Sequence, residues 1–176
     1  MILIGEIRDE ETAKIAAEAA LTGHLVFSTL HTNDAPSSVS RLVEMGVEPY
    51  LLSAVVRAIV AQRLIRRLCI KCKSKVMLDP KKVEALQKTY KVENPSIFKP
   101  KGCGTCNQTG YKGRVAIHEI LTINDELAQA INDHKSTTEL SIMAKKGGFK
   151  SLAYDGYAKV CQGITTFREI DKVALG

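Results

Sequence analysis

The sequence predicts an α/β fold with parallel strands and helices, interrupted by a four-cysteine zinc-binding insert and followed by a C-terminal bundle of short helices. Three observations predict it. Residues 2–30 contain an apolar run, an alanine-rich segment and a second apolar run, the pattern of a strand–helix–strand unit. Two C-x-x-C pairs begin at Cys69 and Cys103. After residue 124, capping residues and glycines divide the chain into short helical segments.

The composition is that of a folded protein. The 176 residues are enough for one domain or two small ones, and 45% of them are apolar, which supports a hydrophobic core. No apolar run approaches the roughly 18 residues that cross a bilayer. The chain begins without a secretory signal pattern, so we expect a cytosolic protein with reduced thiols.

The first elements form a strand–helix–strand unit. Residues 2–5 are a short continuous apolar run, as expected for a strand buried on both faces. Asp9 is a good N-cap for an alanine-rich helix that ends at Thr22-Gly23. Residues 25–30 form a second strand. The crossover of about twenty residues suits a parallel pair, with helices covering both faces of the sheet.

The later elements alternate with turn and capping signals. Asn33 or Asp34 caps a helix that runs to about Met45, and a further helix spans Pro49–Ala61 and leads into residues 62–68. The remaining predicted elements are a helix over Pro80–Lys88, a strand over Gly113–Ile123, and four short helices over Asp125–Asn132, Thr137–Lys146, Ser151–Gln162 and Thr166–Val173.

These signals divide the chain into three predicted parts. Residues 1–68 carry the strand–helix–strand unit. Residues 69–112 have fewer apolar residues and many lysines, and they form the tetracysteine insert. Residues 113–176 contain the returning strand and the closing helices.

The cysteine spacing indicates a structural zinc site. Cys69, Cys72, Cys103 and Cys106 form two C-x-x-C pairs, and two such pairs can close a tetrahedron of thiolates around Zn²⁺. Two disulfides or a redox pair are the alternatives. A disulfide within one C-x-x-C is strained, and an oxidising compartment is not indicated, so we favour zinc. Cys161 lies in an apolar helical stretch and is predicted to be a core residue.

Residues 57–75 are strongly basic and contain no acid. The chain has a net charge of +6, and this run contributes Arg57, Arg63, Arg66, Arg67, Lys71, Lys73 and Lys75. The run can meet nucleic acid or an acidic membrane surface. It can also offset the negative charge of a Zn(Cys)4 centre and solvate one face, which we favour because no stacking aromatic accompanies it.

Polar side chains follow both strands of the predicted unit. Glu6 comes after the first strand, and Thr29 and His31 close the second. Ligands of a parallel sheet lie beyond the carboxyl ends of its strands. There an acid can orient water on a metal-bound nucleotide, and a histidine can donate to a terminal phosphate. His24 opens the second strand, roughly 20 Å from His31. The two histidines therefore cannot share one metal, and His24 is predicted to act at the opposite edge, at a subunit contact or as a structural histidine.

These residues sit in longer strings that resemble a known family. Residues 4–9 (Ile-Gly-Glu-Ile-Arg-Asp) resemble the Walker B segment of the type II secretion and type IV pilus assembly motor ATPases, and residues 22–35 resemble that family's histidine box. The four cysteines resemble the metal-binding insert of its assembly branch. Residues 110–119 resemble the strand after that insert, and residues 152–166 contain strings similar to its closing helices.

The resemblance implies a partial RecA-like P-loop ATPase lobe that works as a hexameric ring. It implies ATP and Mg²⁺ as cofactors besides Zn²⁺, with Gly5, Glu6, Thr29 and His31 at the nucleotide. Glu6 would be the Walker B acid near Mg²⁺ and the attacking water, and His31 would sense the γ-phosphate. His24 would be the first histidine of the box, and Arg8 would serve positioning or a subunit contact.

The resemblance further implies a motor that acts at the cytoplasmic side of the inner membrane, with a platform protein of the secretion or pilus machine as its partner. It does not predict a nucleic acid partner. One departure is large, because the chain contains no G-x-x-x-x-G-K-[ST] loop to bind the phosphates. We therefore expect the C-terminal portion of a motor, starting at the Walker B strand, and predict that this portion alone does not hydrolyse ATP. The alternative is a zinc-stabilised interaction module without nucleotide chemistry, which could bind nucleic acid through residues 57–75.

Overall fold

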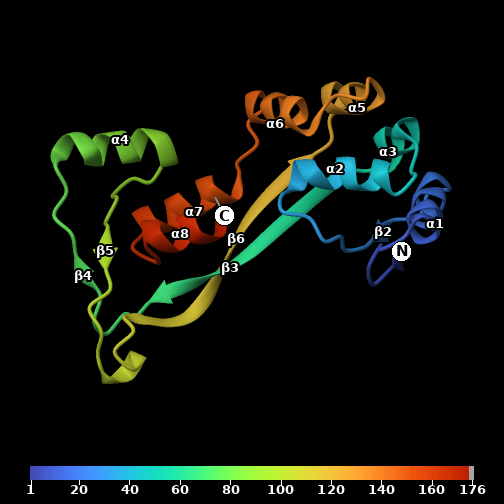
Figure 1. The fold of residues 1–176 in the computed structure, drawn as a ribbon. Coiled ribbons are helices and arrows are strands. Elements are labelled where there is room, and N and C mark those ends of the chain that lie inside the picture. The colour runs from blue at the N-terminus through green and yellow to red at the C-terminus, as the bar shows by residue number, and fades with distance from the viewer. Residues whose placement is uncertain (175–176) are drawn as a thin grey trace. The chain divides into compact units, whose positions relative to one another are not determined.

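The structure is a computed structural model in which residues 1–174 are described, and the chain divides into two compact units (Figure 1). Unit 1 comprises Met1–Ala61 and Glu119–Phe149, and unit 2 comprises Gln62–His118 and the chain from Lys150 onward. Each unit therefore joins two separate stretches of sequence. Within residues 1–174, none of the helices is both long and apolar enough to cross a membrane.

Two strands contribute one end to each unit. They are β3 (Ala58–Leu68) and β6 (Tyr111–Thr122), which pair with each other. In unit 1 the Ile123 N–H donates to the Arg57 carbonyl at 3.0 Å, and in unit 2 the Cys69 N–H donates to the Gly110 carbonyl at 2.9 Å. Since the residue numbers of the partners run in opposite directions, the ladder is antiparallel.

Unit 1 holds the strand–helix–strand unit. Its other elements are β1 (Ile2–Leu3), α1 (Glu10–Leu21), β2 (Val26–Phe27), α2 (Ala35–Glu44), α3 (Pro49–Val55), α5 (Asp125–Asn132) and α6 (Thr137–Lys146). As predicted, β1 and β2 are parallel, with Ile2 opposite Val26 and Leu3 opposite Phe27.

The prediction that the first strand is buried on both faces is wrong. The strand covers only Ile2–Leu3, and the Leu3 side chain is 80% exposed. Phe27 beside it on β2 is exposed as well. Within the described residues the sheet of β1 has two strands, so α1 can bury one face while the other lacks the covering that the apolar sequence indicates.

The helices begin where the sequence predicts caps. The Asp9 carboxylate accepts the Thr12 N–H at 2.8 Å, and the Asp34 carboxylate accepts the Ser37 N–H at 2.8 Å. At α6, Ser136 and Glu139 form a reciprocal capping box. These local hydrogen bonds satisfy N–H groups that have no partner inside a helix.

The prediction of one helix over Pro49–Ala61 is wrong in its second half. The helix α3 ends at Val55, and residues from Ala58 onward form β3. The segment contains β-branched Ile59 and Val60, which suit a pleated strand. Its partner strand β6 lies about fifty residues further along the chain, so the pairing that selects the strand is not visible locally.

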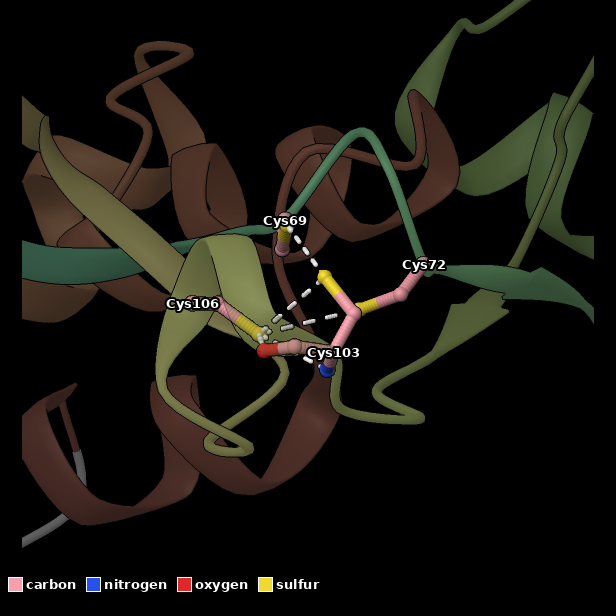
Figure 2. A group of neighbouring side chains, drawn as sticks. All are labelled: Cys69, Cys72, Cys103 and Cys106. Atoms are coloured by element: carbon pink, nitrogen blue, oxygen red, sulfur yellow. Dashed lines mark hydrogen bonds between the residues drawn. The ribbon is translucent and has the colours of Figure 1, made fainter.

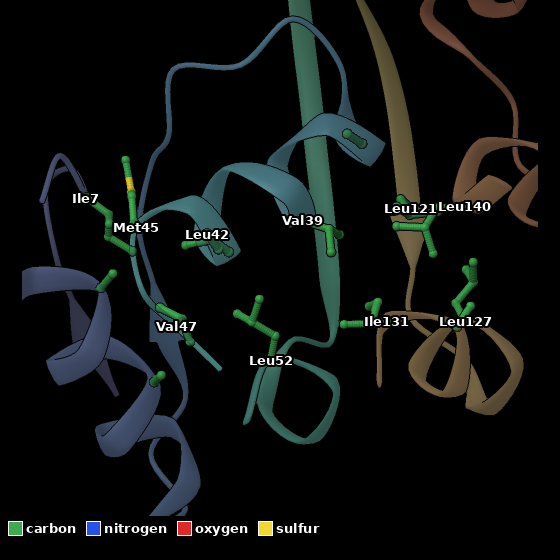
Figure 3. Packing of buried hydrophobic residues seen from close by; sticks show 14 of the residues in the cluster. Ile7, Val39, Leu42, Met45, Val47, Leu52, Leu121, Leu127, Ile131 and Leu140 are labelled. Atoms are coloured by element: carbon green, nitrogen blue, oxygen red, sulfur yellow. The ribbon is translucent and has the colours of Figure 1, made fainter. Parts of the chain in front are cut away.

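The core of unit 1 lies between its helices (Figure 3). Side chains from α1, α2, α3, α5 and α6 meet there, together with Leu121 of β6. The larger buried members are Ile7, Val39, Leu42, Met45, Val47, Leu52, Leu121, Leu127, Ile131 and Leu140. This packing fixes the helices that follow the two polar strand ends.

Unit 2 contains the cysteine loops and the last two helices. Besides parts of β3 and β6, its elements are β4 (Ser74–Lys75), α4 (Pro80–Tyr90), β5 (Phe98–Lys99), a 3₁₀ turn (Gly104–Cys106), α7 (Leu152–Cys161) and α8 (Phe167–Ala174). The strands β4 and β5 pair antiparallel. The four short helices predicted after residue 124 all occur, and they are divided between the units, with α5 and α6 in unit 1 and α7 and α8 in unit 2.

Candidate functional site

The structure brings Glu6 and His31 together at the ends of the two parallel strands of unit 1. The Glu6 Oε1 atom lies 2.7 Å from His31 Nε2, and Arg8 lies 2.6 Å from the other carboxylate oxygen. The Glu6 side chain is only 21% exposed, whereas His31 is 87% exposed. The Glu6 carboxylate thus lies between the Arg8 guanidinium and the His31 imidazole, and the imidazole is open to a ligand.

One oxygen of Glu6 is buried without a hydrogen bond. Although Oε1 is close to the His31 ring, it has no partner with hydrogen-bond geometry among the described residues. Hydrogen bonding to Arg8 holds the pKa of the Glu6 carboxyl below its usual range, despite the opposing effect of burial. A buried, unsatisfied carboxylate oxygen is costly unless a metal, water or ligand meets it, so the residue fits the predicted role beside a magnesium-bound phosphate.

Gly5 and Thr29 connect the two strand ends. The Thr29 hydroxyl donates to the Gly5 carbonyl at 2.8 Å. The space where a Gly5 side chain would stand is open, with no atom within 4 Å. A ligand can therefore approach the backbone closely at this point, as a nucleotide site requires.

The His24 ring contacts residues at the end of α1. Its Nδ1 lies 3.2 Å from the Thr22 hydroxyl and 3.2 Å from the Ala19 carbonyl at the end of α1. As predicted, His24 precedes β2 while His31 follows it. The contacts with α1 hold His24 where the chain enters the strand.

Glu119 supports the loop after His31, a role that sequence reasoning missed. This carboxylate on β6 is buried and accepts the Ala35 N–H at 2.6 Å, at the start of α2. The available signal was the alternation of Glu119 with the apolar residues Ile117 and Leu121, which places the acid on the buried face of the strand, where it requires a partner. Its partner lies 84 positions away and could not be identified from the sequence.

The four predicted cysteine ligands converge in unit 2 (Figure 2). Cys69 and Cys72 lie on the loop after β3, and Cys103 and Cys106 bracket the turn before β6. Their sulfur atoms all lie within 4.8 Å of one another, with Cys69–Cys103 at 4.0 Å and Cys72–Cys106 at 3.8 Å. Sulfurs around a tetrahedral zinc stand about 3.8 Å apart when each Zn–S bond is about 2.3 Å. The donor set therefore fits Zn²⁺.

Backbone N–H groups surround the sulfur of Cys106. The N–H groups of Cys103 and Gly110 donate to it at 3.3 Å and 3.2 Å. Burial opposes ionisation of Cys106, but these donors outweigh it and lower its pKa to about 6. Burial raises the pKa of Cys72 to about 11. Zinc binds cysteine as the thiolate, so a bound cation would favour the ionised form of Cys72 against the effect of its burial.

Two basic residues of the segment 57–75 make contacts within unit 2. Arg66 donates through Nε to the buried Glu169 at 2.7 Å, and its guanidinium lies 4.3 Å from the Tyr111 ring centre. The Lys73 ammonium donates to the Gly163 carbonyl at 2.7 Å. These contacts give two cations of the run partners within unit 2. That the run offsets the charge of a Zn(Cys)4 centre stays a prediction.

Known proteins resemble this chain over almost its whole length. The sequence profile of the family described as "Type II/IV secretion system protein" matches residues 1–172. The chain is 50% identical over 171 residues to the "Type IV pilus assembly ATPase PilB" of Thermus thermophilus, and 45% identical over 174 residues to the "Type II secretion system protein E" of Pectobacterium carotovorum. These matches cover 97% and 98% of this chain, but only 19% and 34% of the relatives.

Solved structures share the fold. The crystal structure of the pilus retraction motor PilT with bound ADP matches with a TM-score of 0.66 and 24% identity, covering 99% of this chain and 40% of that one. The Yersinia pseudotuberculosis ATPase DotB matches with a TM-score of 0.67 and 20% identity, covering 99% and 37%. The chain thus shares the α/β fold of these two proteins and spans a minor part of each of them.

Proposed function

The chain belongs to the type II/IV secretion system protein family, and on this premise we propose that it is the C-terminal portion of a motor ATPase that powers type II secretion or type IV pilus assembly. The observation that carries the proposal is the Glu6–His31 pair. An ionised carboxylate with one buried, unsatisfied oxygen stands 2.7 Å from an exposed imidazole at the ends of two parallel strands.

Each residue of the proposed nucleotide site has a separate role. Bound magnesium would supply charge neutralisation for the phosphates. Glu6, kept ionised by Arg8, accepts a hydrogen bond from the attacking water and orients it. His31, exposed beside it, donates to a terminal phosphate oxygen. Thr29 holds the Gly5 carbonyl and so keeps both strand ends in register.

The cysteine site has a structural role in this proposal. Four sulfurs would occupy all four coordination positions of a tetrahedral zinc, so no position is open to a substrate. Zinc would hold the loop after β3 to the loop before β6 and so fix the folded state of unit 2. In the complete motor we propose a hexameric ring on the cytoplasmic side of the inner membrane, in contact with a membrane platform protein.

The chain of 176 residues is proposed not to hydrolyse ATP by itself. Phosphoryl transfer in P-loop ATPases depends on a loop of backbone N–H groups and a lysine around the phosphates. The sequence contains no G-x-x-x-x-G-K-[ST] to supply them. Turnover by the purified chain above that of its Glu6→Ala variant would contradict this proposal.

A replacement experiment tests the function. The matching region of the Thermus thermophilus relative is exchanged for this chain, which the 50% identity favours, and pili are counted by electron microscopy. We expect pili with the exchanged sequence and none when it carries Glu6→Gln. Glu18→Gln, an exposed acid of α1, is the matched control and should leave the pili intact. Normal pili with Glu6→Gln would refute the role of Glu6.

A further inference from the structure

Unit 2 contains a cavity outside the sites described above. Its volume is about 630 Å³, within the range of about 300–1,000 Å³ that is typical of small-molecule sites. It is lined from β5, from the start of β6 and from α8, with apolar walls from Val76, Ile97 and Pro100. The cavity lies wholly within one unit, so its walls are fixed by that unit's own packing.

The charge in this cavity is positive. Lys99, Arg168 and Lys172 line it, and no acidic residue is among its lining residues. Arg168 and Lys172 stand four positions apart on α8, which places two like charges on the same side of the helix. Two acids lie between them in the sequence. Glu169 is buried and its carboxylate pairs with Arg66, and the Asp171 carboxylate accepts the Tyr157 hydroxyl at 2.8 Å. Among the described residues, Lys99, Arg168 and Lys172 form no salt bridge.

Aromatic rings stand next to these cations. Tyr111 is held in place by Arg66 over its ring and by a 2.9 Å hydrogen bond between its hydroxyl and that of Thr166. Phe167, at the start of α8, is 41% exposed and lines the same cavity. A flat ring can pack on Phe167 while a charged group reaches the cations, because both line one continuous space.

We propose that this cavity binds a nucleoside phosphate, with the phosphates at Lys99, Arg168 and Lys172 and the base against Phe167. Clustered like charges raise the free energy of the unit, and a multiply charged anion relieves it. The apolar walls favour a ring over a bare anion. The site is separate from Glu6 and His31, which belong to unit 1, so it would act as a second, non-catalytic ligand site.

Titration of the isotope-labelled chain with ADP tests the proposal by NMR. We expect ADP to shift the backbone signals of Lys99, Phe167 and Arg168. Signals of Glu6 report any binding at the other site separately. The double variant Lys99→Gln/Arg168→Gln should weaken binding about fivefold or more. The matched control is Lys82→Gln, an exposed lysine of α4 outside the cavity, which should leave the affinity unchanged.

Pyrophosphate, adenosine and a tetraglutamate peptide complete the test. We expect pyrophosphate to bind more weakly than ADP and adenosine to bind weakest. Absence of cavity shifts with ADP, or equal affinity in the double variant, overturns the proposal. Equal affinity for pyrophosphate and ADP overturns the role of Phe167, and tighter binding of tetraglutamate assigns the cavity to an acidic protein segment instead. If the double variant does not fold, Lys172→Gln replaces it with the same expected loss.

Discussion

Replacing Cys103 by serine removes one of the four sulfurs that meet in unit 2. The Cys103 sulfur lies 4.0 Å from that of Cys69 and 3.8 Å from that of Cys106, close to the edge length of about 3.8 Å of a zinc tetrahedron. Structural zinc contributes about 10–16 kcal/mol to folding, whereas a whole domain is stable by about 5–15 kcal/mol. The variant should therefore lose zinc and most of the structure between residues 69 and 106.

The loss should spread through unit 2 along identified contacts. Lys73 donates to the Gly163 carbonyl, and the Ser96 N–H donates to the Cys161 carbonyl at 2.7 Å. The end of α7 and the residues that directly follow it should therefore lose their protection from hydrogen exchange together with the cysteine loops. Unit 1 has its own core and should keep much of its structure, including the parallel pair of β1 and β2.

Zinc analysis and hydrogen exchange measure both effects. We expect one zinc per wild-type chain, and fast exchange of residues 69–106 in Cys103→Ser or after chelation. Cys161→Ala, which removes a cysteine outside the cluster, should keep one zinc per chain. A purified wild-type chain that is folded and free of metal would refute the reasoning, as would unchanged exchange in Cys103→Ser.

Two further predictions concern buried carboxylates. Hydrogen bonding to Arg66 lowers the pKa of Glu169, so this pair stabilises unit 2 above the ordinary carboxyl pKa, and the stabilisation is lost as pH falls through the lowered value. Arg66→Ala should reduce the unfolding free energy of unit 2 by about 1–3 kcal/mol near neutral pH. In urea titrations at several pH values, the unfolding free energy of the variant should also fall less steeply toward acid pH. An unchanged pH dependence would contradict this. Glu119→Ala leaves the Ala35 N–H without its acceptor and should destabilise unit 1 by about 1–3 kcal/mol. Glu119→Gln keeps a carbonyl oxygen and should restore most of the lost stability. Equal stability of the two variants would argue against that hydrogen bond.

The elements that depend on local chemistry were predictable from the sequence. Asp9, Asp34 and Ser136 each cap a helix by bonding to N–H groups three residues ahead, and such bonds need no distant partner. The contact between Glu6 and His31 follows from the strand order as well, because polar residues after two parallel strands meet at one edge. The roles of the two residues remain a proposal.

The elements that depend on distant partners were not predictable. Ala58–Ala61 reads as the end of a helix, yet it pairs with the end of β6, far along the chain. The burial of Leu3 was also wrongly predicted, since an apolar side chain indicates a covered face without indicating what covers it. The Arg66–Glu169 pair joins residues 103 positions apart, and nothing in the sequence near either residue identifies the other as its partner.

Single-turnover hydrolysis of MgATP by the purified protein carrying this chain in place of the matching PilB region tests the role of Glu6 most directly. Glutamine at position 6 keeps the size of the side chain and removes the charge that Arg8 stabilises. We predict that Glu6→Gln binds MgATP as the unsubstituted protein does and hydrolyses it about 100-fold more slowly or worse. Hydrolysis at the unsubstituted rate would contradict the assignment of Glu6 and, with it, the proposed site at the strand ends.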